Sequence, residues 1–213
     1  MAHIFGAIES IEILDGVAAA LLAATATARA RNFGAHFTGA IVLGCVCGMV
    51  GGLAREIFLN GSAGARVALA SLPQSALIGA LGGAVAIRFL PSRKDAVFFW
   101  LDAASLGLAG ALGAALGLPG LGVVGAMALG LVSGLAPSLA RDVSLGDTAM
   151  IVEKSWYATA VALGCVGTIG VAIGGLVIDE VAYARIGEYA VVFGALLTMA
   201  IRGWKGRDEE NRL

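Results

Sequence analysis

The stretch FTGAIVLGCVCGMVGGLAREIFLNG, residues 37–61, decides the fold class. About 18 residues pass without a charge, which is long enough for a helix to cross the hydrocarbon core of a bilayer. Gly44, Gly48 and Gly52 recur every four residues, so they form a stripe without side chains along one helix face. Gly51 beside Gly52 favours a bend at this level. We therefore interpret the stretch as a glycine-rich spanning helix.

The end of this stretch and its glycine pattern return 86 positions later. The stretch closes on Ala54-Arg55-Glu56, and Ala140-Arg141-Asp142 closes the later copy. The other matched positions are Gly39 with Gly125, Gly44 with Gly130, Gly48 with Gly134, Leu14-Asp15 with Leu101-Asp102, and Ile78-Gly79 with Leu163-Gly164. These matches predict two copies of one structural unit.

The composition indicates a membrane protein. Of the 213 residues, 59% are hydrophobic and 14% are charged, and the mean hydropathy is +0.90. Soluble domains are about 45–50% apolar and about 25% charged, so a soluble core of this size cannot hide so much apolar surface. The 32 glycines lie inside apolar runs, where they are typical of close packing between membrane helices.

Seven apolar segments each approach the ~20 residues that a spanning helix needs. They lie at about 9–28, 37–58, 70–90, 96–117, 120–140, 156–178 and 186–204. Because each copy holds three spans, the second copy enters the membrane from the opposite side. We predict an all-α membrane protein with seven transmembrane helices, built from two inverted three-helix repeats plus a seventh helix. Residues 1–213 then form one domain, with repeat 1 at about 9–90, repeat 2 at about 96–178, the extra helix at about 186–204 and a short tail at 205–213.

The basic residues predict the orientation. With the N-terminus outside, eleven Lys and Arg residues fall on the cytoplasmic side, and Arg55, Arg66 and Arg185 fall on the outer side. This bias satisfies the positive-inside rule, and an odd number of spans places the C-terminus in the cytoplasm. The RGWKGR stretch at 202–207 is expected to close the last helix with basic residues at the inner headgroups. The N-terminus lacks a basic n-region, so we interpret it as the first span and not as a signal peptide.

Each repeat supplies one Asp and one Arg at matching depth on adjacent helices. Charges in the hydrocarbon cost roughly 2.5–3.5 kcal/mol and usually face a partner or a wet cavity. We therefore hypothesise Asp15–Arg55 and Asp102–Arg141 pairs at the two mouths of one pathway. Glu56 and Asp142 follow the two arginines and belong to the same mouths. The alternative is that Arg55 and Arg141 only snorkel to the lipid headgroups.

Glycine and proline are expected to break the second and fifth spans. The breaks are Gly51-Gly52 and Gly134-Leu-Ala-Pro137, where Pro137 removes a backbone donor. Broken helices at matching positions of inverted halves indicate a transport site at the midplane. Freed carbonyls, with the hydroxyls of Ser133 and Ser138, can replace water around a cation there. The alternative is that GxxxG spacing only lets helices touch, which we favour for Gly44 and Gly48 taken alone.

We find no catalytic residues, metal ligands or cofactor motif in the sequence. Cys45 and Cys47 point in different directions on a helix, so we interpret them and Cys165 as packing residues. The sequence has no Walker-type GxxxxGK[ST], no HExxH and no nucleophile elbow. A net charge of −1 leaves no basic footprint for nucleic acid. We therefore predict a protein that is not an enzyme.

These residues resemble the trimeric intracellular cation (TRIC) channels, and most closely the bacterial branch, also catalogued as glycine transporters. The resemblance runs from about Asp15 to Trp204, and GMVGGLARE at 48–56 is its most specific part. It implies a homotrimer in a bacterial inner (cell) membrane, with a potassium-permeable pore in each subunit lined chiefly by spans two and five. The kink positions carried over are Gly48, Gly51 and Gly52, then Gly134 and Pro137. The chain departs from the family's triple glycine, reading Gly-Met-Val-Gly-Gly and Gly-Leu-Ala-Pro.

The predicted function is passive conduction of monovalent cations, with potassium first and sodium also a candidate. Ions are expected to lose part of their hydration at the two helix breaks, while Arg55 and Arg141 shape the electrostatics of the mouths. No cofactor is expected. The expected partners are membrane lipids, one of which could be bound, and two further copies of the chain. The alternatives are a carrier for a small solute such as glycine, and a scaffold whose glycine stripes only assemble helices.

Overall fold

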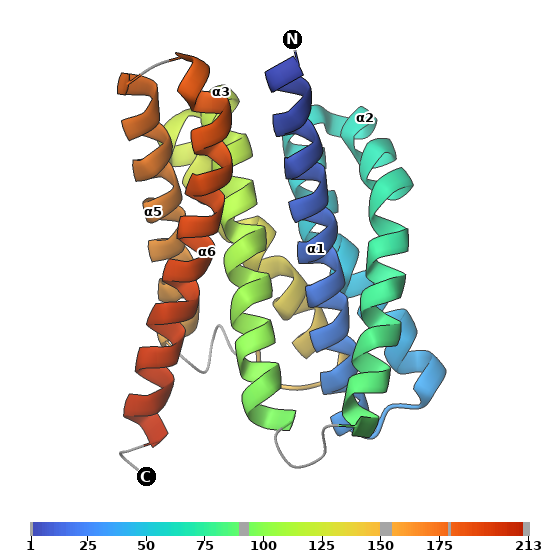
Figure 1. Cartoon of the computed structure of the whole chain (residues 1–213). Coiled ribbons are helices and arrows are strands. Elements are labelled where there is room, and N and C mark those ends of the chain that lie inside the picture. Colours follow the sequence, from blue (N-terminus) through green and yellow to red (C-terminus); the bar gives the residue numbers. More distant parts are fainter. Residues whose placement is uncertain (1, 90–93, 150–154, 179, 211–213) are drawn as a thin grey trace.

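The computed structural model describes the backbone of residues 2–89, 94–149, 155–178 and 180–210, and the side chains of 11–85, 99–149, 157–174 and 189–204. All regular elements in these ranges are α-helices. They are α1 (Ala2–Asn32), α2 (Phe37–Phe89), α3 (Lys94–Ser144), α5 (Ser155–Ile178) and α6 (Glu180–Glu210). The helices run side by side as one bundle, and the N- and C-termini lie at opposite ends of it (Figure 1).

Helix α2 reverses its direction at a single glycine. Gly61 has φ 60° and ψ −140°, a conformation that glycine adopts without steric cost. On either side of it, Gly44 packs against Ala80, Gly48 against Ala76 and Gly52 against Leu72. As the residue number of the glycine rises from 44 to 52, the residue number of its partner falls from 80 to 72, so the two arms of α2 are antiparallel.

Helix α3 reverses in the same way at Gly122, which has φ 66° and ψ −174°. Gly117 packs against Ala126, and Gly110 packs against Gly130, again with opposite direction in the two arms. The predicted spans at about 96–117 and 120–140 put this connection near residues 118–119, but the helix continues past Pro119. The reversal occurs at the residue that takes a positive φ, which proline cannot adopt.

The segments predicted to be broken, Gly51-Gly52 and Gly134–Pro137, keep helical dihedral angles. Inside α2 the described backbone leaves helical dihedral angles at Gly61, and inside α3 at Gly122. Pro137 is buried inside α3 and has no N–H to donate. Gly51 and Gly134 make close contacts with neighbouring helices, and a bend at these positions stays a prediction.

The chain is a multi-pass membrane protein. Within the residues that the structure describes, four stretches are long and apolar enough to cross a bilayer: Ile11–Asn32, Phe37–Val85, Phe99–Ser144 and Tyr157–Gly174. Tyr189–Trp204 is a shorter apolar helix. Large apolar side chains also cover the outside of the bundle, among them Val124 at 84% exposure and Ile78 at 69%. Such a surface suits contact with lipid and would be unusual in water.

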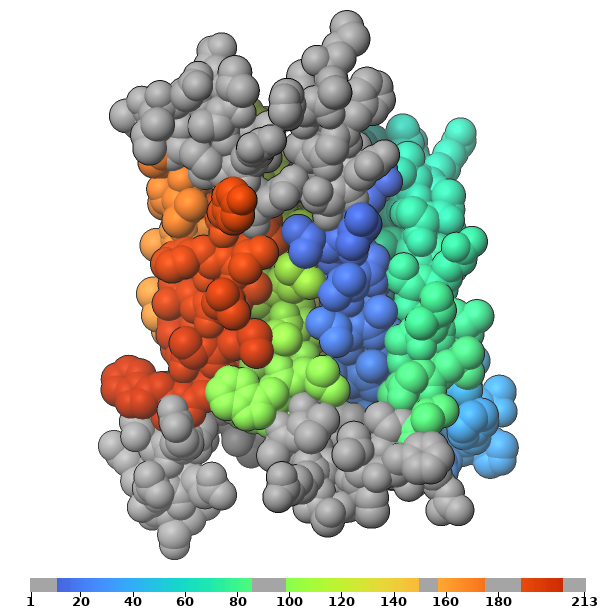
Figure 2. Space-filling view, viewed as in Figure 1, coloured from blue at the N-terminus to red at the C-terminus, as the bar shows by residue number. Residues whose placement is uncertain are grey.

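Small residues bring the helices close together. A side chain on Gly48 would meet the Ala19 carbonyl oxygen at 2.7 Å and the Ala23 Cβ at 2.8 Å, both on α1. Gly164 of α5 and Gly194 of α6 contact each other through backbone and Thr side chains in the same manner. On the face shown in Figure 2, the first arm of α3 lies at the surface between α1 and α6.

Gly44 and Gly48 both contact α1 and the second arm of α2, so the interpretation that they pack closely against other helices is confirmed.

Candidate functional site

The structure brings Asp15 of α1 and Arg55 of α2 together as an ion pair. Arg55 donates from Nη1 to Asp15 Oδ1 at 2.9 Å and from Nη2 to Asp15 Oδ2 at 2.8 Å. This two-pronged geometry is the strong form of a guanidinium–carboxylate contact. The Arg55 side chain is 3% exposed and that of Asp15 is 19% exposed. Glu56 lies 3.5 Å from Arg55 and accepts a hydrogen bond from Asn60 at 2.9 Å.

Asp102 and Arg141, on the two arms of α3, also form an ion pair. Arg141 donates from Nη1 to Asp102 Oδ1 at 2.8 Å, and its Nε donates to Asp142 Oδ1 at 2.7 Å. Asp102 Oδ2 accepts a hydrogen bond from the Tyr157 hydroxyl at 3.1 Å and lies 3.0 Å from Arg202 Nη2. Two aspartates and two arginines therefore form a buried network without net charge.

Sequence analysis missed Arg202 and Tyr157 as members of this network. Arg202 was assigned to the inner headgroups, but its side chain is 1% exposed and points to Asp102. Its guanidinium lies 4.6 Å from the centroid of the Tyr157 ring and 5.1 Å from that of Phe99. Both distances fall within the range of cation–π contacts. The sequence did hold a signal for Arg202. A residue that anchors a helix to the headgroups normally follows the apolar run, whereas Arg202 lies inside the run that ends at Trp204.

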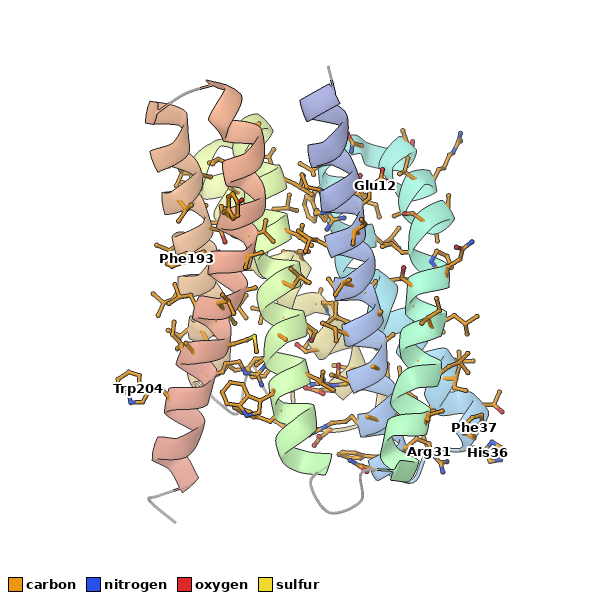
Figure 3. All side chains as sticks on the ribbon, viewed as in Figure 1. Glu12, Arg31, His36, Phe37, Phe193 and Trp204 are labelled. Atoms are coloured by element: carbon orange, nitrogen blue, oxygen red, sulfur yellow. The ribbon has the colours of Figure 1, made fainter. Side chains whose placement is uncertain are left out.

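The two clusters lie toward opposite ends of the bundle. Figure 3 shows Glu12, one turn before Asp15, near one end, and Trp204, two residues after Arg202, near the other. A further ion pair, between Arg29 and Asp147 at 2.6 Å, joins the end of α1 to the segment after α3. It was not predicted, because Asp147 lies in a connecting segment with no span periodicity.

Between the two clusters, the first arm of α2 crosses the second arm of α3. A Cβ on Gly51 would meet the Ser133 carbonyl oxygen at 2.5 Å and the Pro137 Cγ at 3.0 Å. The Ser133 hydroxyl is buried and lies 3.5 Å from the Gly51 carbonyl oxygen. The two helices are therefore in van der Waals contact at this level, which closes any route between them here.

The other predicted site residues lie around this crossing in packing roles. Gly52 faces Leu72, and Gly134 faces the Leu106 carbonyl oxygen and Gly110. The Ser138 hydroxyl donates to the Leu135 carbonyl oxygen at 2.9 Å within its own helix. Within the described ranges, no three His, Cys, Asp or Glu side chains gather as a metal site. The chemistry that this arrangement offers is electrostatic, with neutralised charges at two ends and close-packed helices between them.

Comparison with known proteins gives the family context. The family model described as "Glycine transporter" matches residues 12–91 and 99–173. The solved structure of the TRIC trimeric intracellular cation channel orthologue from Rhodobacter sphaeroides is 25% identical, with a TM-score of 0.74 over 91% of this chain and 95% of that one. No curated protein sequence gave a significant match.

Two further structures share the fold at lower identity. A crystal structure of a prokaryotic TRIC channel in 0.5 M KCl is 18% identical, with a TM-score of 0.77 over 92% of this chain and 96% of that one. A TRIC cation channel structure, solved to explain conductance through these channels, is 18% identical, with a TM-score of 0.71 over 92% of this chain and 93% of that one. At this identity the likeness concerns the fold.

Proposed function

The chain belongs to the TRIC family, which the glycine-transporter model describes, and from this premise we propose that it is a passive cation channel with one pore in each subunit of a homotrimer. Potassium is the proposed permeant ion. The observation that carries the proposal is the pair of Asp–Arg contacts, which occupy matching positions in two halves of the chain and flank one helix crossing.

In this proposal the chain crosses the membrane seven times as two inverted repeats plus α6. The single-glycine reversals at Gly61 and Gly122 support this count, because each divides one long helix into two arms of spanning length. The termini at opposite ends of the bundle fit an odd number of passes (Figure 1). We place the N-terminus outside and the C-terminus in the cytoplasm of the inner membrane, following the basic residues.

The proposed pore runs between residues 37–60 of α2 and 123–144 of α3. At each mouth an aspartate neutralises an arginine, so a cation approaches without facing a net positive charge. The narrowest level is the crossing of Gly51 with Ser133 and Pro137, which is shut in the described state. Opening requires these arms to separate, and the oxygens of Ser133 and Gly51 then replace part of the ion's water.

A planar bilayer that holds the purified protein under a potassium gradient tests this function. We expect unitary, ohmic currents that reverse near the potassium equilibrium potential. Saturable glycine uptake into liposomes without such currents would favour a carrier instead. If protein that is folded and trimeric gives no glycine uptake and no currents, a scaffold role is the one that remains.

The substitution Arg55→Leu tests the role of the first mouth. It leaves Asp15 as an unpaired carboxylate, which raises the local cation concentration. We expect single-channel potassium conductance to rise about twofold at 50 mM salt and to return toward the wild-type value at 1 M, where the Debye length is about 3 Å. The double variant Asp15→Asn/Arg55→Leu is expected to lose this salt-dependent gain.

Arg66→Leu is the matched control, because Arg66 is exposed just beyond Gly61 and makes no ion pair within the described residues. It is expected to change the conductance much less than Arg55→Leu. Equal conductance in wild type and Arg55→Leu at every salt concentration would mean that Arg55 has no role at a mouth.

A further inference from the structure

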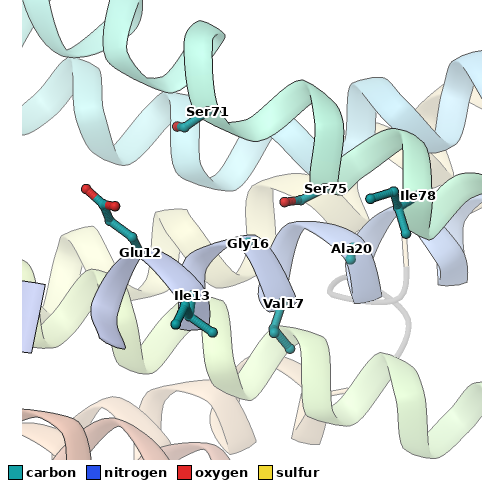
Figure 4. A pocket seen from close by; sticks show the side chains of 8 residues that line it. All are labelled: Glu12, Ile13, Gly16, Val17, Ala20, Ser71, Ser75 and Ile78. Atoms are coloured by element: carbon teal, nitrogen blue, oxygen red, sulfur yellow. The ribbon is translucent and has the colours of Figure 1, made fainter. Parts of the chain in front are cut away.

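An open groove of about 570 Å³ lies between α1 and the second arm of α2. Its wall on α1 is formed by Glu12, Ile13, Gly16, Val17 and Ala20, and its wall on α2 by Ser71, Ser75 and Ile78 (Figure 4). Gly16 forms the narrow part, because a Cβ there would lie 3.0 Å from Ser75 Oγ. None of these residues belongs to the two ion-pair clusters or to the crossing.

The groove changes in polarity along its length. Glu12 and Ser71 lie toward one end, Ser75 lies midway opposite Gly16 and Val17, and Ala20 and Ile78 lie toward the other end (Figure 4). The Glu12 end is the end of the bundle where α1 begins (Figure 3). In a membrane, the polar end then lies toward the headgroups and the apolar end toward the midplane. A lipid molecule has the same gradient over the same direction.

The charge of the groove selects among lipids. Glu12 is the charged residue of the lining, and the described part of the chain offers it no ion pair. A carboxylate repels an anionic headgroup and attracts a cationic one. A primary ammonium carries three N–H donors, which match the carboxylate acceptors of Glu12 and the hydroxyl acceptor of Ser71 at the same end. A trimethylammonium group of similar charge offers no such donors.

We propose that this groove binds a phosphatidylethanolamine molecule, with its ammonium group at Glu12 and one acyl chain along Val17, Ala20 and Ile78. The proposal requires that the chain spans a membrane, and it does not require that the chain conducts ions. Val17 and Ala20 form the apolar wall on α1, and Ile78, at 69% exposure, forms the wall on α2.

Native mass spectrometry of the full-length protein tests the proposal. The protein is delipidated in detergent and mixed with equal amounts of phosphatidylethanolamine, phosphatidylcholine and phosphatidylglycerol, and the bound lipids are counted. We expect wild type to retain phosphatidylethanolamine about tenfold better than phosphatidylcholine, since a charge-assisted hydrogen bond is lost with the latter. Glu12→Gln, which keeps the shape of the side chain, is expected to abolish that preference.

Gly16→Leu fills the groove and is expected to lower binding of all three lipids at this site. Ala20→Leu, which fills the apolar end of the same groove, replaces it as a test if the first variant does not fold. Glu56→Gln is the matched control at the same end, because Glu56 does not line the groove. Equal retention of phosphatidylethanolamine and phosphatidylcholine by wild type would overturn the proposal. Displacement of the bound lipid by soluble phosphoethanolamine would overturn the acyl-chain contact.

The same spectra report the oligomer mass, which distinguishes the lipid from a neighbouring subunit as occupant. If Glu12→Gln or Gly16→Leu changes the number of subunits and leaves the lipid count unchanged, a second copy of the chain covers the groove and the proposal is wrong. A changed lipid count at constant oligomer mass supports it.

Discussion

The Asp102→Asn variant is expected to lose much of its stability in detergent. Arg141 and Arg202 share the Asp102 carboxylate, and their side chains are 5% and 1% exposed. The substitution leaves Asp142 as the carboxylate of a network with two buried guanidiniums, so one positive charge loses its compensation, and breaking a buried pair in this way costs about 3–5 kcal/mol. Folded proteins have a total stability of about 5–15 kcal/mol, so this is a large fraction. The measurement is the midpoint of thermal unfolding together with the monodisperse fraction in size-exclusion chromatography.

Asp15→Asn is the matched control, because Asp15 pairs with Arg55 as Asp102 pairs with Arg141. Asp15 is 19% exposed, and Arg55 keeps Glu56 at 3.5 Å, so the remaining charge is partly solvated and partly paired. We expect a loss well below that of Asp102→Asn. Adding Arg202→Met to Asp102→Asn should recover part of the stability, because it removes one guanidinium and leaves an apolar chain between the two rings. Equal losses for the two Asp→Asn variants would contradict the asymmetry of the clusters.

The Gly51→Ala variant is expected to raise the open probability of the channel about tenfold. The added Cβ would lie 2.5 Å from the Ser133 carbonyl oxygen and 3.0 Å from the Pro137 Cγ, so the two arms must move apart. Overpacking of this kind costs about 1–3 kcal/mol. If the strain is confined to the closed state, it shifts the equilibrium toward the open state by the same free energy. Single-channel recording in planar bilayers measures the change.

Gly39→Ala is the control for this substitution. Gly39 lies on the same arm of α2, and an added Cβ has nothing within 4 Å. Its open probability should equal that of wild type. A folded Gly51→Ala protein whose open probability is unchanged or reduced would show that the crossing does not close the pore.

Several parts of the structure could be predicted from the sequence because they follow from local physics. Apolar length and glycine content predict membrane helices, and the structure and the family match confirm a membrane protein of the TRIC family. The pairing of Asp15 with Arg55 followed from the rule that a charge in lipid needs a partner, and the contact is present. The assignment of mouths and pore to these residues stays a proposal.

Other parts depend on long-range packing that no local pattern encodes. The doublet Gly51-Gly52 satisfies the pattern for a bend and equally that for a close contact, and only the position of Ser133 and Pro137 reveals the contact. Arg202 has the composition of a headgroup anchor, but α6 places it beside Asp102 and between two aromatic rings. Neither the partner helix nor its register can be read from the residues themselves.

The one-residue reversals at Gly61 and Gly122 have a consequence for how the helices can move. With a single non-helical residue between them, the two arms of α2 stay joined at one end of the bundle, and so do the two arms of α3. Neither arm can slide along its partner without changing the turn. Relative motion inside each pair is therefore limited to small changes of angle about the glycine.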